Sequence, residues 1–186
     1  MTTRRRAALC AAVALAPPRL LAAAAPARVL ILRHAATEPG IGDPPGFVLG
    51  RCVTQRNLSA EGRAQASDFG RGLAARGWRP AALRSSRWCR CLDTAGGIAA
   101  ALGPDAPAVE PWPALDSFFD DRARAPAQTA QLLARLGALA CGHAFEVWVT
   151  HQVNISALTG AAPAMGEALW LLPGDGARAQ TLRFAS

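Results

Sequence analysis

The chain has 186 residues, of which 51% are hydrophobic, a length and composition that suit one domain with a substantial core and leave too few residues for a second full domain. Its formal net charge of +7 would suit a nucleic-acid partner. However, all 20 basic residues are arginines scattered along the sequence, so the charge reflects composition and we expect no nucleic-acid binding.

The N-terminal segment has the layout of a secretory signal. Three arginines at positions 4–6 precede an apolar stretch over Ala7–Ala16, and small residues follow. We therefore expect residues 1–27 to be a signal peptide, residues 28–186 to form a single domain, and the protein to be periplasmic or secreted. Pro17–Arg19 interrupts the apolar stretch, so we expect no stable membrane anchor. An ordinary Ala-rich N-terminal helix is the alternative interpretation.

The first predicted strand ends in two residues suited to chemistry. Val29–Leu32 is a short apolar run typical of a buried strand, and Arg33 and His34 follow it directly. In an open α/β sheet, ligands bind outside the carboxyl ends of the strands, so a permanent cation beside a titratable imidazole is a candidate site. Taken alone, the pair has an alternative explanation as a surface histidine after an edge strand.

The next segments establish a β-α-β pattern. After a Gly- and Pro-rich loop, Ser59 is placed to cap a helix whose apolar residues recur at helical spacing up to Gly77. Trp78–Ser85 predicts a second strand together with the residues that lead into it, and Arg90–Leu102 predicts a second helix. A strand, a crossover helix and another strand indicate an α/β fold with parallel strands.

The second half of the chain repeats the arrangement of the first strand. The segment Val109–Pro113 is predicted to be irregular, and an acidic-aromatic patch, Leu115–Asp121, follows it. Phe145–Thr150 has the strongest strand propensity of the chain and ends directly at His151. The remaining predicted elements are helices at Gln128–Leu139 and Asn154–Thr159, and strands at Ala168–Leu172 and Thr181–Phe184 around a Gly174–Gly176 turn.

The cysteines indicate a disulfide if the chain is exported. Cys52, Cys89, Cys91 and Cys141 would meet an oxidising compartment. A bridge from Cys52 to either Cys89 or Cys91 would tie the loop after the first strand to the segment that bears Arg90, although buried, reduced cysteines are the simpler alternative. Three histidines without ligand-like spacing make a poor zinc site, so we expect no metal and no other cofactor.

Three predicted strand ends place polar residues at one edge of the sheet. Arg33 and His34 follow the first strand, Ser86 and Arg90 the second, and His151 a later one. Two imidazoles and two guanidiniums that converge there would suit a tetrahedral dianion, because arginine binds phosphate in a fork geometry.

These motifs resemble those of the histidine phosphatase superfamily, over roughly residues 29–172. The family's Arg-His-Gly stands here as Arg33-His34-Ala35, and its Ser-x-x-x-Arg-x-x-x-Thr-Ala pattern stands as Ser86–Ala95. Asn57–Gly62 is similar to the family's helix entry, and Val149–His151 followed by Ala157–Gly160 is similar to its second-histidine motif. The resemblance implies a three-layer α/β/α fold of the phosphoglycerate mutase type, with a mainly parallel central sheet.

The resemblance also implies a metal-independent phosphatase that hydrolyses a phosphate monoester or a phosphoramidate. His34 would form a covalent phosphohistidine, while Arg33, Arg90 and His151 hold the phosphoryl oxygens. Further substrate contacts are expected from Thr37, Asn57 and Ser86. The implied partner is a small phosphorylated substrate or a phosphoprotein, and the oligomeric state stays open.

The general acid is the least defined part of the site. The mutase-like branch uses a Glu two residues after a Leu, whereas here Leu115 is followed by Asp116 and then Ser117. Asp116 is the first candidate, and a solvated turn carboxylate is its alternative interpretation. Behind it stand Asp120, Glu38 and Asp43.

A chain without a general acid allows other functions. It would favour labile substrates, whose leaving groups need little help. It would also suit a catalytically weak or inactive module of the cell envelope that binds phosphate or phosphoglycan. A weaker alternative is an envelope protein whose basic surface binds anionic lipid.

Overall fold

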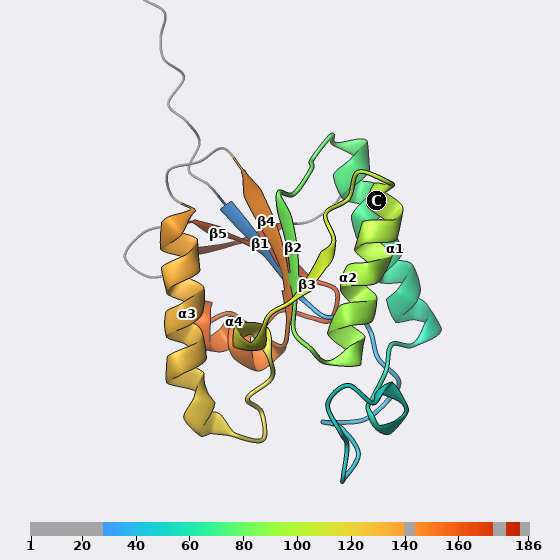
Figure 1. The fold of residues 1–186 in the computed structure, drawn as a ribbon, viewed down its shortest axis with the longest axis vertical. Coiled ribbons are helices and arrows are strands. Elements are labelled where there is room, and N and C mark those ends of the chain that lie inside the picture. The colour runs from blue at the N-terminus through green and yellow to red at the C-terminus, as the bar shows by residue number, and fades with distance from the viewer. Residues whose placement is uncertain (1–27, 140–143, 173–177, 183–186) are drawn as a thin grey trace, which may run out of the picture.

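The computed structural model describes residues 28–139, 144–172 and 178–182, and its centre is a six-stranded sheet of order β3-β2-β4-β1-β5-β6 (Figure 1). The expected signal peptide, Cys141 and the Gly174–Gly176 turn lie outside the described residues. Four strands run parallel: β1 (Arg28–Arg33), β2 (Ala82–Ser85), β3 (Val109–Pro111) and β4 (Phe145–Thr150). The strand β5 (Ala168–Leu172) is antiparallel to β1, and β6 (Arg178–Leu182) is antiparallel to β5.

Helices cover both faces of this sheet, which confirms the three-layer α/β/α prediction. Figure 1 shows α1 (Ala60–Ala75) and α2 (Cys89–Leu102) on one side of the sheet and α3 (Ala125–Ala138) and α4 (Gln152–Thr159) on the other. Within residues 28–139 and 144–172, no helix is long and apolar enough to cross a membrane.

The strand β1 divides the core between the two faces, because successive side chains of a strand point to opposite sides. Leu30 and Leu32 pack in the core with α1 and α2, next to residues such as Ile98. Val29 and Ile31 belong to the core on the side of α3 and α4. These four apolar side chains of β1 are all buried, as expected for a central, parallel-paired strand of a sheet covered on both faces.

The register of β1 against its neighbours fixes where the site forms. Arg33 pairs with Thr150 of β4, so His34 and His151 leave two adjacent strands at the same level. Ser85 of β2 pairs with Val149, which brings Ser86 to the same edge. The convergence of strand ends that the sequence predicts therefore follows from parallel pairing in this register.

Some element bounds differ from the sequence prediction. Val109–Pro111 forms the short edge strand β3 inside a segment predicted to be irregular, and its proline is tolerated because it lies at the end of an edge strand. The helix α3 begins at Ala125, earlier than predicted, with Pro126 in its first turn where a missing N–H costs nothing. The helix α4 begins directly after His151, and β6 begins at Arg178.

The helix α1 packs closely on the loop that follows His34. Gly62 of α1 has no room for a side chain, because a Cβ there would lie 1.8 Å from the carbonyl oxygen of Ala36. The same loop is held by the side chain of Gln65, whose Oε1 accepts a hydrogen bond from the Ala36 N–H at 2.9 Å. The loop therefore cannot move away without losing a contact.

We expect Gly62→Ala to lower the free energy of unfolding by roughly 2 kcal/mol or more, because the added methyl group overlaps backbone atoms. Gly96→Ala in α2 is the matched control, since a Cβ there meets no atom within 4 Å. Because alanine favours a helix interior, the control should be more stable than the parent by about 0.5–1 kcal/mol. Urea denaturation measures both, and equal stability of the two variants would contradict the close packing.

Candidate active site

A cavity of about 420 Å³ lies at the carboxyl edge of the parallel strands. Arg33, His34, Arg90 and His151 line it together, although they come from β1, the start of α2 and the end of β4. The structure thus brings together the residues that the sequence predicts to attack or hold a phosphoryl group. The loop 40–43 and the segment 117–122 form much of the remaining wall.

His34 is buried and held in one tautomer. Its side chain is 3% exposed, and its Nδ1 lies 2.9 Å from the carbonyl oxygen of Ala35. Since a carbonyl oxygen only accepts, Nδ1 carries the hydrogen and Nε2 keeps its lone pair. Burial, helped by the charges of Arg90 and Arg33, lowers the pKa of His34 to about 3 and outweighs the Ala35 hydrogen bond, which raises it. His34 is therefore a neutral imidazole with a free nucleophilic nitrogen at neutral pH.

His151 lies beside it, with the two ring centroids 5.4 Å apart. Burial, followed by the charge of Arg90, lowers its pKa well below the usual value. Nη2 of Arg90 lies 3.5 Å from Nδ1 of His151, and Oγ of Ser86 lies 2.9 Å from Nε2. Because a guanidinium only donates, Nδ1 accepts and Nε2–H donates to Ser86, whose own hydroxyl is 3.3 Å from Oδ1 of Asp116.

Three guanidiniums crowd the anion end of the cavity. Arg56 lines it together with Arg33 and Arg90, and the Nε atom of each of the three is buried without a hydrogen-bond partner among the described residues. Burial and the neighbouring guanidiniums lower the pKa of both Arg33 and Arg56. A bound oxyanion would accept hydrogen bonds from these unpaired, buried and positively charged groups.

Arg56 is a residue of the site that the sequence motifs do not predict. It lies immediately before the Asn57-Leu58-Ser59 motif, at the return of the long loop to the start of α1. An arginine directly before a helix-entry motif was the available signal. Its distance of more than twenty residues from His34 along the chain hides its place in the cavity.

Asp43 is the carboxylate that is bonded to this cationic cluster. Its Oδ1 accepts from Nη1 of Arg90 at 2.8 Å and from the backbone N–H of Arg56 at 3.0 Å, and its Oδ2 accepts from Nε1 of Trp88 at 3.0 Å. Burial raises the pKa of Asp43, but these hydrogen bonds and the charge of Arg90 outweigh burial and hold the pKa below its usual value. Asp43 is thus an ionised acceptor and a poor proton donor.

Asp116 does not lie where a general acid is needed. Its side chain is fully buried and accepts from the backbone N–H of Arg87 at 2.9 Å and from the Arg87 Nε at 2.8 Å. It is absent from the cavity lining, whereas the next residue, Ser117, is part of it. The backbone at Asp116 is extended, so adjacent side chains point to opposite sides. The shift by one residue against the family pattern therefore places Asp116 behind the site.

Thr37, Asn57 and Glu38, which the sequence also suggests, lie outside the lining. Thr37 donates to Sδ of Met165 at 3.7 Å and pairs with Leu58 in an isolated bridge, and Asn57 donates to the carbonyl of Cys52 at 2.8 Å. Glu38 is exposed and does not line the cavity. Among the four acids named from the sequence, Asp43 and Asp120 line it, and Asp120 is exposed.

The part of the chain that the structure describes has no group of histidine, cysteine and acidic side chains arranged to hold a metal ion. Four arginines and two aspartates line the cavity, so its charged groups carry a net positive charge that repels a metal ion and attracts an anion. The arrangement can bind a tetrahedral oxyanion and present a neutral imidazole to it.

A sequence profile of the histidine phosphatase superfamily, branch 1, matches residues 29–119. No curated protein sequence matches the chain. The fold is similar to that of the protein histidine phosphatase SixA complexed with tungstate, with 15% identity, 84% of this chain and 94% of that chain covered, and a TM-score of 0.58.

Two mycobacterial structures are similar as well. A glucosyl-3-phosphoglycerate phosphatase has 18% identity, with 83% of this chain and 96% of that chain covered and a TM-score of 0.58. A protein described as mycobacterial hydrolase 1 has 18% identity, with 86% of this chain and 99% of that chain covered and a TM-score of 0.57. At these identities the likeness shows the fold.

We expect stability to fall as the pH is lowered from 6.5 toward 3 because of His34 and His151. Both have pKa values lowered in the folded state, so between these limits the unfolded chain binds protons that the folded chain does not. Each histidine should contribute a slope of up to about 1.4 kcal/mol per pH unit. Urea denaturation between pH 4.5 and 6.5 measures it, and His34→Asn should make the slope shallower; an unchanged slope would contradict the neutral state of His34.

Proposed function

The chain belongs to the histidine phosphatase superfamily, and from this membership we propose that it is a phosphatase that hydrolyses a phosphate monoester or a phosphoramidate. The observation that supports this most directly is the neutral, tautomer-fixed His34 in a cavity lined by three guanidiniums with unpaired Nε–H donors. That SixA was solved with tungstate, a tetrahedral oxyanion, fits a cavity of this kind. The substrate would be a small phosphorylated molecule or a phosphoprotein.

In the proposed first step, the lone pair on Nε2 of His34 attacks the phosphorus atom. The bond from phosphorus to the leaving oxygen or nitrogen breaks, and its electron pair stays with the leaving group. Arg33, Arg56 and Arg90 bind the phosphoryl oxygens and stabilise the charge of the transition state, with His151 beside them. The hydrogen bond from Nδ1 to Ala35 stabilises the positive charge that develops on the ring.

In the second step, water attacks the phosphohistidine and the bond between phosphorus and Nε2 breaks. Inorganic phosphate leaves and His34 returns to its starting state. All charge stabilisation in this scheme comes from side chains of the chain, so the proposed reaction needs no metal.

The proton for the leaving group comes from Asp120 or from solvent. Asp43 and Asp120 are the carboxyl groups of the cavity lining, and Asp43 already accepts hydrogen bonds from Arg90 and Trp88. Asp120 belongs to the lining segment 117–122 and is exposed to solvent. We therefore assign Asp120 in place of Asp116 as the acid for leaving groups that need one.

His34→Ala should lower turnover of a chromogenic aryl phosphate by roughly 10³-fold or more, because it removes the nucleophile. The native protein, quenched in alkali during turnover, should carry an acid-labile phosphate that peptide mass spectrometry assigns to His34. His143→Ala, outside the described residues, is the matched histidine control. Vanadate binding without turnover by the native protein would favour a phosphate-binding module of the envelope instead.

Asp120→Asn should slow hydrolysis of phenyl phosphate by about 10- to 100-fold and hardly affect 4-nitrophenyl phosphate, whose leaving group departs without a proton. The neighbouring Asp121→Asn is the matched control, since Asp121 is exposed and does not line the cavity. Steady-state kcat/KM for the two substrates measures the difference. Equal losses on both substrates would rule out Asp120 as the acid.

A further inference from the structure

The Cys52–Cys89 disulfide joins the loop that bears Asp43 to the residue before Arg90, and we propose that it holds Asp43 against Arg90, so that affinity for the phosphoryl group depends on the redox state of this bridge. In this arrangement Asp43 is a positioning residue, which acts on the ligand through Arg90. The inference rests on the proposed function only in assigning Arg90 to the phosphoryl group.

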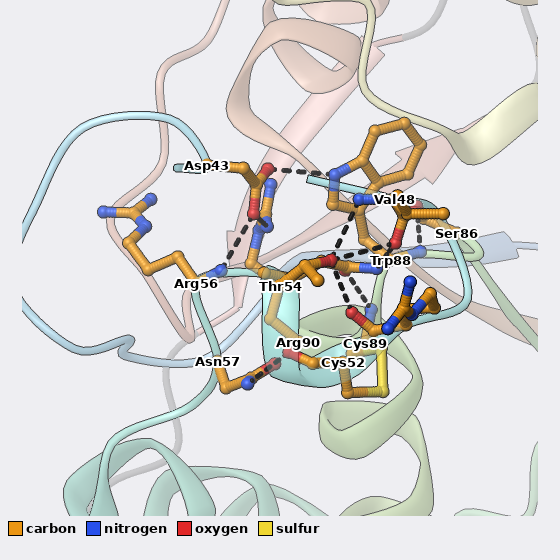
Figure 2. The surroundings of a disulfide bond; sticks show 12 residues. Asp43, Val48, Cys52, Thr54, Arg56, Asn57, Ser86, Trp88, Cys89 and Arg90 are labelled. Carbon is orange, nitrogen blue, oxygen red and sulfur yellow. Dashed lines mark hydrogen bonds and ion pairs between the residues drawn. A yellow bond between two sulfur atoms is a disulfide. The ribbon is translucent and has the colours of Figure 1, made fainter. Parts of the chain in front are cut away.

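The segment 40–57 is fastened to the first turn of α2 at several points (Figure 2). Asp43 accepts from Arg90 at 2.8 Å and from Trp88 at 3.0 Å. Oε1 of Gln55 accepts from the backbone N–H of Cys89 at 3.0 Å. The disulfide adds a covalent link between Cys52 and Cys89, which are 37 positions apart in the sequence.

Outside these points the segment has little to hold it. Ile41 and Val53 are 92% and 90% exposed, and Phe47 and Leu49 are only partly buried against the core. Many of its other hydrogen bonds join two residues of the same segment. One example is the bond that the Thr54 hydroxyl donates to the Arg51 carbonyl at 2.7 Å. A segment with few buried apolar contacts opens easily when its cross-link is lost.

Arg90 depends on this segment for its orientation. Asp43 binds Nη1, and His151 lies at 3.5 Å from Nη2, which leaves the buried Nε–H without a partner among residues 28–139 and 144–172. An arginine side chain has many rotamers, so ordering it costs conformational entropy. Fixing the side chain before the ligand arrives removes this cost from the free energy of binding. The same segment also presents Arg56 to the cavity.

The bridge is accessible to a reductant on one side. Cys52 is exposed, whereas Cys89 is 1% exposed. A thiolate of a dithiol reductant attacks Sγ of Cys52, the S–S bond breaks, and Cys89 leaves as a thiolate that takes up a proton. The second thiol of the reductant then displaces Cys52, which gives two cysteine thiols and one oxidised dithiol. Burial raises the pKa of the nearby Cys91 to about 12, so Cys91 does not compete as a nucleophile.

The test compares vanadate and inorganic phosphate dissociation constants for the oxidised and the reduced full chain, with thiol counts to prove each state. We expect reduction by dithiothreitol to raise Kd by about fivefold or more, the lower end of the usual coupling between two sites. By reciprocity, saturating phosphate should make the bridge harder to reduce by the same factor. Cys52→Ser is the matched control, which should resemble the reduced protein and show no response to dithiothreitol.

Asp43→Asn shows whether the bridge acts through Asp43. The baseline affinity of this variant combines a lost tether with a lost negative charge beside the anion, so the informative quantity is the ratio of reduced to oxidised Kd. We expect that ratio to fall toward one in Asp43→Asn, because the variant and the reduction remove the same constraint. A ratio equal to that of the native protein, or no change of Kd on verified reduction, would overturn the inference.

The Trp88 indole N–H gives a readout that needs no phosphate. Because it donates to Asp43, its NMR signal, assigned with Trp88→Phe, should shift when the bridge is reduced. If the oxidised protein binds neither vanadate nor phosphate, the proposed function fails, while this signal still tests whether the bridge holds Asp43 in place. An unchanged signal on reduction would contradict the proposed hold of the bridge on Asp43, even in a protein that binds phosphate well.

Discussion

Three guanidiniums share one small, partly buried space with two imidazoles, and the rest of the site depends on this concentration of positive charge. Like charges at low dielectric repel strongly, so the cluster persists only with counter-charges and rigid supports. Burial lowers the pKa of His34 and His151, and the charges of these guanidiniums lower it further, so both imidazoles stay unprotonated. A buried site with a positive charge thus both suits an oxyanion and keeps the nucleophile neutral.

Two buried carboxylates support this cluster from different sides. Asp43 neutralises Arg90 from the loop, whereas Asp116 binds Arg87 and reaches His151 through the Ser86 hydroxyl. Hydrogen bonds and the charge of Arg90 hold the pKa of Asp43 below its usual value, and Asp116 does not line the cavity, so neither is placed to protonate a leaving group. The site is therefore rich in groups that bind a phosphoryl group and poor in groups that protonate a leaving group, which favours substrates with stable leaving groups.

The framework and the loop contribute differently to stability and function. Parallel pairing places His34 and His151 at one level on rigid, buried strands, so this half of the site needs no further support. Arg56 and Asp43 come from a long, mostly exposed segment that the core anchors only weakly. A covalent bridge at Cys52 and Cys89 supplies the rigidity that packing does not.

The sequence by itself determined the α/β class, the main helices and strands, and the meeting of Arg33, His34, Arg90 and His151. These residues lie at or just after the ends of periodic apolar segments. Parallel pairing brings the carboxyl ends of such strands to the same edge of the sheet. Tertiary structure alone decided the roles of Asp43, Arg56 and Asp116 and chose Cys89 over Cys91 as the partner of Cys52. The path of an irregular loop, and the side to which an extended residue points, depend on contacts between distant segments that no local pattern encodes.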